Sequence, residues 1–234
     1  MKKLSSRAIA AVTNGLLVLV LIVVGTVCFF PAAQSVSSVE EKAIHSGNSE
    51  NGVSLMINVY WGTDEVYGIL DVLESHNATA TFFIGGSWAD DNVAALKAIV
   101  EKGHEVGSHG YFHRDHTTLT REQNIDEIRR SVEFISLATG YTVTLFAPPS
   151  GAYNDTVTDA AEAMGMKTIL WSKDTVDWRD KDESVCFNRA TNGVKGGDLI
   201  LMHPMEHTLA ALPKILDYYA EHGLKTVSVS ENIS

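Results

Sequence analysis

The sequence predicts an α/β fold in which a mainly parallel sheet is curled into a barrel, preceded by a transmembrane helix. From Val53 onward, strand-like apolar runs alternate with helical patterns, and this alternation is typical of parallel strands with helices outside them. Seven strand candidates are enough for a closed or nearly closed barrel. The first 33 residues differ in composition from the rest and contain a long uncharged run.

The N-terminal segment predicts a membrane anchor. Lys2, Lys3 and Arg7 precede a run from Ala8 to Phe30 that has no charged residue. Such a run is long enough to cross about 30 Å of hydrocarbon, and the basic residues place its short N-terminal side in the cytoplasm. A cleaved signal peptide is the alternative, because small residues follow at Pro31–Gln34. Either way, the remainder of the chain is expected outside the cytoplasmic membrane, anchored or secreted.

Three regions follow from composition. Residues 1–33 form the cytoplasmic tip and anchor, or the signal peptide. Residues 34–51 are rich in Ser, Gly, Asn and Glu, which predicts a flexible linker. Residues 52–234 form the globular domain.

The first half of the domain contains three strands and two helices. A strand is expected over 53–60, and the next helix has its apolar face at Val66, Ile69, Leu70 and Leu73. Residues 80–84 predict the second strand, and residues 93–100 predict a helix that ends near Gly103. The third strand is expected over 104–108.

The second half continues the same alternation. Thr120 and Gln123 form a capping box that opens a long helix, and Gly140 ends it. A further helix is expected after Asn154. In the last helix, Pro213 is expected near the start and Gly223 just past the end. The remaining strands are expected over residues 143–147, 168–172, 198–202 and 225–229.

The charge of the chain disfavours nucleic acid as a partner. Outside the three basic residues of the leader, 15 Lys and Arg stand against 29 Asp and Glu, a net charge of −14. An acidic surface of this kind repels phosphates.

Residues capable of chemistry follow the predicted strands, where sites gather in barrels of this kind. His109 and His113 are separated by three intervening residues in a glycine-containing loop, a spacing at which two imidazoles can bind one ion. The alternative is that they are solvated loop residues. The other segments that follow strands are 60–64, 146–151, 174–178 and 201–204.

These segments resemble the motifs of the polysaccharide deacetylases of carbohydrate esterase family 4, the NodB-homology family. The resemblance covers nearly all of residues 53–230. The motif His-Ser/Thr-x-x-His resembles His109–His113, with Gly110 in the Ser/Thr place, and Arg-Pro-Pro-Tyr-Gly resembles 147–151. Asp-x-x-Asp-Trp matches 174–178, and Leu-x-x-His resembles 200–203.

The resemblance implies a distorted barrel of about seven strands and metal-dependent removal of N-acetyl groups from a cell-wall glycan. A divalent ion activates water, a carboxylate takes its proton, and a histidine protonates the departing amine. The implied cofactor is zinc, with cobalt and manganese as alternatives. His109 and His113 are the implied metal ligands, and His203 is the acid, oriented by Asp174. Substrate contacts are implied for Tyr60, Trp61, Pro148, Pro149, Trp178 and Leu201.

The first family motif, Thr-Phe-Asp-Asp-Gly, is replaced by residues 58–62. Tyr60 occupies the place of the base and Trp61 that of a metal ligand, while Ala147 replaces the arginine that holds the base. A tyrosine with a pKa of about 10 is a poor base, and an indole offers only a donor. Asp64 is expected either as a substitute ligand or base, or as a helix N-cap.

His116 is expected either as a third histidine ligand or as a solvated loop residue, and His203 either as the acid or as a core histidine. The leading hypothesis is therefore a metal-dependent deacetylase. The alternatives are a glycan-binding pseudoenzyme of the same fold and a hydrolase of other non-peptide amides.

Overall fold

The computed structural model describes residues 15, 16, 18–20 and 42–234. The chain divides into two compact units, residues 1–40 and 41–234, and the second unit holds the whole sheet. The predicted anchor over residues 8–30 lies almost entirely outside the described residues. Within the described part of the chain, we find no helix long and apolar enough to span a membrane.

The domain is built on one curled sheet whose paired strands are all parallel. The strand order is β1-β6-β5-β4-β3-β2-β8-β7, and β9 pairs with β2 off this path. The strands are β1 (Ala43–Ile44), β2 (Gly52–Val59), β3 (Thr81–Ile84), β4 (Glu105–Ser108), β5 (Leu145–Phe146), β6 (Lys167–Ile169), β7 (Lys173–Asp174), β8 (Leu199–Met202) and β9 (Lys225–Thr226).

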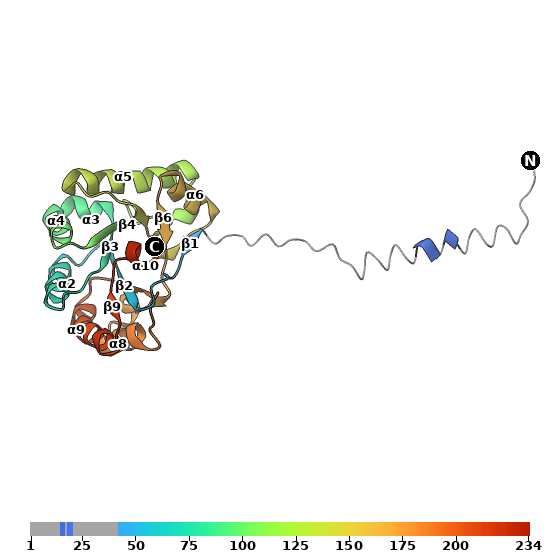
Figure 1. The fold of residues 1–234 in the computed structure, drawn as a ribbon. Coiled ribbons are helices and arrows are strands. Elements are labelled where there is room, and N and C mark those ends of the chain that lie inside the picture. The colour runs from blue at the N-terminus through green and yellow to red at the C-terminus, as the bar shows by residue number, and fades with distance from the viewer. Residues whose placement is uncertain (1–14, 17, 21–41) are drawn as a thin grey trace, which may run out of the picture. The chain divides into compact units, whose positions relative to one another are not determined.

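Helices surround the strands (Figure 1). Around the sheet, α8, α9, α2, α4, α5 and α6 follow one another as packed neighbours. The helices are α2 (Thr63–Ser75), α3 (Gly86–Asp91), α4 (Val93–Glu101), α5 (Arg121–Thr139), α6 (Asp155–Ala163), α7 (Asp177–Asp180), α8 (Glu183–Thr191), α9 (Glu206–Glu221) and α10 (Val229–Asn232).

The two faces of β2 supply two separate cores. Val53, Leu55, Ile57 and Val59 pack in the cluster between the sheet and its helices. Met56 points the other way, into the barrel interior, with Phe83, Leu145, Ile169 and Leu199. Because side chains alternate along a strand, Asn58 faces the same interior as Met56, one layer nearer the carboxyl end. This alternation determines which residues reach the site.

Helix α10 packs at the end of the barrel where the amino ends of the strands lie. Val229 packs in the interior cluster, and the side chain of Asn232 donates to Ser54 Oγ at 3.0 Å. Helix α10 therefore covers the barrel interior at the amino ends of the strands.

The sequence predictions hold for most elements, including the Thr120–Gln123 capping box of α5 and its end at Gly140. All seven predicted strands have counterparts, and β1 and β7 are additional two-residue strands. The curled sheet agrees with the predicted barrel, but it is open, because none of the described pairings joins β1 to β7.

Two predictions differ from the structure. Pro213 lies in the middle of α9 rather than near its start, because the buried stripe of this helix already begins at Thr208. The predicted linker ends earlier than residue 51, because β1 pairs with β6 and the amide of Gly47 donates to Gly197.

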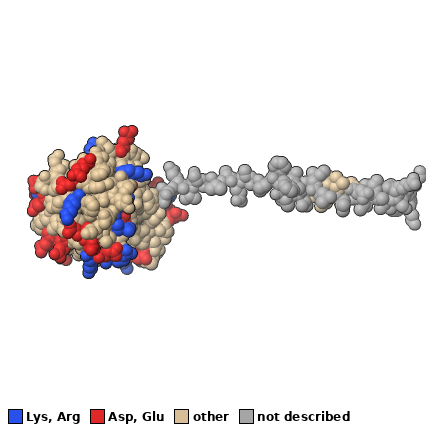
Figure 2. Space-filling view, turned by 90° about the horizontal axis from the view of Figure 1, so that it is seen from below, with Lys and Arg blue, Asp and Glu red and all other residues tan. Residues whose placement is uncertain are grey.

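The surface of the domain is mixed in charge. On the face drawn in Figure 2, Asp and Glu side chains are interspersed with Lys and Arg, and the basic side chains form no continuous patch.

Candidate functional site

A pocket of about 290 Å³ opens at the carboxyl ends of the strands. Residues on or just after β2, β4, β6 and β8 point into it from inside the barrel, as strand alternation requires. The lining residues are Asn58, Trp61, His109, His113, Ser150, Trp171, Asp174, Trp178, Leu201 and His203.

The structure brings His109 and His113 together. Their ring centroids lie 5.1 Å apart with the planes at 66°. Two imidazoles that share one ion have centroids about 5 Å apart, given nitrogen–metal bonds of about 2 Å. The tight loop between them depends on left-handed backbone at Gly110 (φ 73°) and His113 (φ 52°). The predicted pair is therefore close enough to act on one ligand.

The ring of His109 is held by a backbone carbonyl of the segment that follows β5. Its Nδ1–H donates to the carbonyl oxygen of Ala147 at 2.7 Å, so the remaining ring nitrogen is an acceptor. Burial, and then the proximity of His113, lower the pKa of His109 to about 3. Burial also lowers the pKa of His113. Both rings are thus neutral at pH 7 and able to offer lone pairs.

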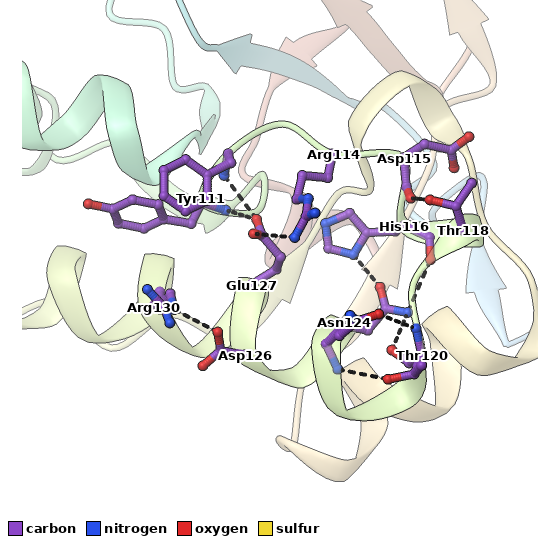
Figure 3. Close-up of polar contacts among 12 residues, drawn as sticks. Tyr111, Arg114, Asp115, His116, Thr118, Thr120, Asn124, Asp126, Glu127 and Arg130 are labelled. Carbon is purple, nitrogen blue, oxygen red and sulfur yellow. Dashed lines mark hydrogen bonds and ion pairs between the residues drawn. The ribbon is translucent and has the colours of Figure 1, made fainter.

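Helix α5 holds the histidine loop through one buried carboxylate (Figure 3). Glu127 Oε2 accepts the backbone N–H groups of Tyr111, at 3.2 Å, and of Phe112, at 2.9 Å. Its other oxygen lies 3.8 Å from the guanidinium of Arg114. The loop is therefore fixed at two consecutive amides, and Glu127 is a positioning residue that no sequence pattern indicated.

His116 fits neither sequence expectation. It is fully buried, its Nδ1 lies 2.5 Å from Asn124 Oδ1, and its ring packs against Phe146 (Figure 3). It does not line the pocket, so it is neither a solvated residue nor a third ligand beside the other two histidines.

On the opposite wall, His203 is oriented by Asp177. Its Nδ1–H donates to Asp177 Oδ1 at 2.8 Å, and its backbone N–H donates to Oδ2 at 2.6 Å. Trp178 N and Thr208 Oγ1 also donate to this carboxylate, each at 2.8 Å. Burial alone would raise the pKa of Asp177, but the hydrogen bonds and charge of His203 outweigh it and lower that pKa.

The role predicted for Asp174 is therefore wrong. Its Oδ1 accepts the backbone N–H of Val176 at 2.7 Å, and the carboxylate on His203 is that of Asp177. Val176 has left-handed backbone (φ 56°), and this turn brings the next residue, Asp177, under the histidine. Asp174 nevertheless lines the pocket.

Tyr60 and Trp61, the two aromatic residues after β2, lie beside the histidines. Trp61 lines the pocket and stacks on His203, with centroids 5.7 Å apart and planes at 8°. The ring of Tyr60 lies 4.9 Å from that of His113, and its hydroxyl accepts from Ser87 Oγ at 3.0 Å. Tyr60 packs beside the pocket rather than lining it.

Asp64 fills neither of its expected roles. It is exposed in the first turn of α2 and does not line the pocket. The N-cap of α2 is Gly62 (φ 74°), with no side-chain cap. An acidic residue in a first helical turn still interacts favourably with the helix dipole, which accounts for Asp64 without a ligand role.

The predicted substrate-contact residues divide into two groups. Trp61, Trp178 and Leu201 line the pocket, whereas Pro148 and Pro149 are buried beside it. Asn58, Ser150 and Trp171 line it without having been predicted as contacts. The available signal was strand alternation, since Asn58 and Trp171 share the inward face of their strands or its continuation.

A hydrolytic metal centre is only partly provided for. Catalytic zinc sites use three protein ligands, and the two imidazoles would supply two of them. Among residues 42–234 and the few described before them, no three His, Cys, Asp or Glu side chains are grouped so that they could hold a metal ion. The residues present therefore do not fit the metal that the resemblance implies.

Comparison with known proteins gives a consistent family. The model of the polysaccharide deacetylase family matches residues 46–169. The uncharacterized protein YlxY of Bacillus subtilis is 34% identical over 83% of this chain and 61% of its own length. The peptidoglycan-N-acetylglucosamine deacetylase PgdA of Listeria monocytogenes is 31% identical over 83% of this chain and 41% of its own. The chain thus spans less than two thirds of either relative.

Solved structures of the same family also match this chain. BA3943 of Bacillus anthracis, described as a CE4 family pseudoenzyme, superposes with a TM-score of 0.80 at 35% identity, covering 82% of this chain and 69% of that one. A mutant of BA3943, described as having restored enzymatic activity, matches with the same TM-score at 33% identity, covering 82% and 71%. The deacetylases and the pseudoenzyme together fit both the leading hypothesis and its glycan-binding alternative.

Proposed function

Because this chain belongs to the polysaccharide deacetylase family, we propose that its pocket binds an acetylated cell-wall glycan without hydrolysing it. The observation that carries the proposal is the pair of aromatic residues, Tyr60 and Trp61, at the positions of the family base and metal ligand. Of the described residues that line the pocket, Asp174 is the one carboxylate, and it pairs with Leu201 of β8; Asp64 does not line the pocket.

Hydrolysis lacks two components at this site. A phenol with a pKa of about 10 does not take a proton from water efficiently at neutral pH, and an indole N–H cannot bind a cation. Trp61 also covers one face of His203, the residue expected to act as the acid. Water at this site therefore has neither the base that the family motif provides nor a complete metal centre to activate it.

Binding is better supported than catalysis. Three tryptophans, Trp61, Trp171 and Trp178, line the pocket, and the side chains of Trp61 and Trp178 are 38% and 50% exposed. Exposed aromatic faces are suited to the apolar faces of sugar rings, and the polar groups between them can bind hydroxyl and amide groups. Such a lining favours a glycan over a charged ligand.

Slow hydrolysis is the second candidate, because the Asp177–His203 pair and the two close imidazoles are retained. One experiment separates the two functions. Purified full-length chain is titrated with N-acetylglucosamine oligomers, and acetate is measured with zinc, cobalt or manganese present. We expect glycan binding with no acetate release. Metal-dependent acetate release by the unaltered chain, or absence of binding to acetylated oligomers and to peptidoglycan, would refute the proposal.

A gain-of-function variant tests the physical reason. Changing Tyr60→Asp and Trp61→Asp together returns both carboxylates, and we expect metal-dependent acetate release from this variant. The matched control is Tyr67→Asp, which alters an aromatic residue of α2, 40% exposed, that does not line the pocket. Acetate release by the control would show that the assay does not report on this site.

We also infer that the domain acts outside the cytoplasmic membrane, held by residues 1–33 or released by their cleavage. Basic residues before the uncharged run favour this orientation. Protease added to intact cells is expected to digest the domain, and full protection of the domain until the cells are lysed would contradict this placement.

A further inference from the structure

The floor of the pocket contains an unpartnered polar group. Asn58 is 4% exposed, lines the pocket, and its Oδ1 is buried with no hydrogen-bond partner. A buried acceptor without a donor destabilises a fold by about 1–3 kcal/mol, so such groups are rare in protein interiors. In the unbound structure, no hydrogen bond compensates for the burial of this oxygen.

The position of Asn58 directs this group towards a ligand. It lies next to the carboxyl end of β2, between β3 and β8, one layer above Met56 of the interior core. His109, Leu201 and His203 line the same pocket. Oδ1 is the enclosed atom of this carboxamide, and because the terminal torsion of an asparagine is broad, rotation about it can bring the oxygen to the pocket side. Leu201, which lines the same pocket, is an apolar residue that a methyl group can contact.

Resting on the proposed function, we propose that Asn58 is the residue that selects N-acetylated sugars, by accepting a hydrogen bond from the acetamido N–H. Of the two ways in which a glycan carries an acetyl group, the amide has an N–H donor and the ester has none. A site built around a buried acceptor discriminates against a ligand without the donor, because the acceptor is then left unpaired. The pocket thus distinguishes N-acetyl from O-acetyl substituents.

The test compares two tetrasaccharides by calorimetric titration of the full-length chain. One carries N-acetyl groups, and the other carries the acetyl as an ester on the corresponding 2-hydroxyl. We expect the unaltered chain to bind the N-acetylated tetramer roughly tenfold more tightly. In Asn58→Leu, which is close in size, we expect this preference to disappear through weaker binding of the N-acetylated tetramer.

Stability provides a readout that a purely structural asparagine would not give. Asn58→Leu removes an unpaired buried acceptor, so its melting temperature is expected to stay the same or rise. The matched control is Asn232→Leu at the closed end of the barrel, where the amide is buried and donates to Ser54 Oγ. This control is expected to melt earlier and to keep the N-acetyl preference.

The outcomes separate the two proposals. Failure of the unaltered chain to bind either tetramer overturns glycan binding itself. Equal binding of the two tetramers, or an Asn58→Leu variant that keeps the preference, overturns only the assignment of Asn58. A fall in the melting temperature of Asn58→Leu as large as that of the control also overturns it, because the asparagine would then be a structural residue.

Discussion

The carboxylate of Asp177 is expected to stabilise the domain, and Asp177→Asn tests this. Each carboxylate oxygen accepts two hydrogen bonds, one of them from a backbone N–H. The amide of an asparagine can accept at only one position, so its NH₂ group must face either the amide of Trp178 or that of His203. A backbone donor cannot reverse, whereas the Thr208 hydroxyl and the His203 ring can.

The magnitude follows from these contacts. One buried backbone N–H without an acceptor costs about 1–3 kcal/mol, and the remaining bonds lose the strength that a charged acceptor provides. We therefore expect Asp177→Asn to lower the free energy of unfolding by about 3 kcal/mol. For a slope of roughly 2 kcal/mol per M urea, the unfolding midpoint falls by about 1.5 M.

Urea unfolding followed by tryptophan fluorescence measures this shift. The control is Asp180→Asn, which changes an exposed carboxylate of the same short helix, paired with Arg179 on the surface. The control is expected to leave the midpoint unchanged. A midpoint shift below about 0.5 M in Asp177→Asn, or an equal shift in the control, would refute the reasoning.

Three further predictions concern the pH dependence of the Asp177 contacts, the histidine loop and Gly151. Because the pKa of Asp177 is lower in the folded state than its unfolded value of about 3.9, the Asp177 carboxylate stabilises the fold above that pH, and this stabilisation is lost as the pH falls through the folded value. The difference in unfolding midpoint between the unaltered chain and Asp177→Asn should therefore shrink below pH 4. A constant difference would contradict this. Glu127→Ala frees two backbone N–H groups of the histidine loop, so mass spectrometry should detect faster hydrogen exchange there than in the unaltered chain, and unchanged protection would argue against a positioning role. Gly151→Ala combines a positive φ with a Cβ 2.5 Å from the Trp171 ring, so it should destabilise the fold by about 2 kcal/mol. This is more than we expect for Gly165→Ala, where φ is also positive but no atom lies within 4 Å of the added Cβ. Equal effects of the two substitutions on thermal unfolding would contradict the argument from the clash with Trp171.

Much of the site could be predicted from the sequence because its residues follow strands. The histidine loop, the segment after β7 and the end of β8 were all placed at the carboxyl edge, and the structure places them around one pocket. Asp174 shows the limit of this reasoning. Two aspartates three residues apart are equivalent in sequence, and only the left-handed turn at Val176 decides that the second one reaches His203.

The role of Asp64 beside Tyr60 and Trp61 was likewise decided only by the tertiary structure. Sequence comparison with the family motifs located Tyr60 and Trp61, but Asp64 remained a candidate substitute until the structure placed it on the exposed first turn of α2. In the same way, His116 followed the histidine pair closely enough to be a ligand. It is instead buried against Phe146 and Asn124, because the short turn that it begins directs its ring under the loop.

By itself, the sequence determined the alternating strands and helices, the resemblance to the family and the presence of Tyr60 and Trp61 where its first motif is expected, because these depend on local periodicity and on residue identity. Only the tertiary structure decided that Asp177 serves His203, that Glu127 fixes the histidine loop and that Asn58 lies unpartnered beneath the pocket. The first two relations join residues that are up to 26 positions apart in the sequence. The third depends on which face of β2 is enclosed. Their physical basis is the packing of the whole barrel, which no local pattern encodes.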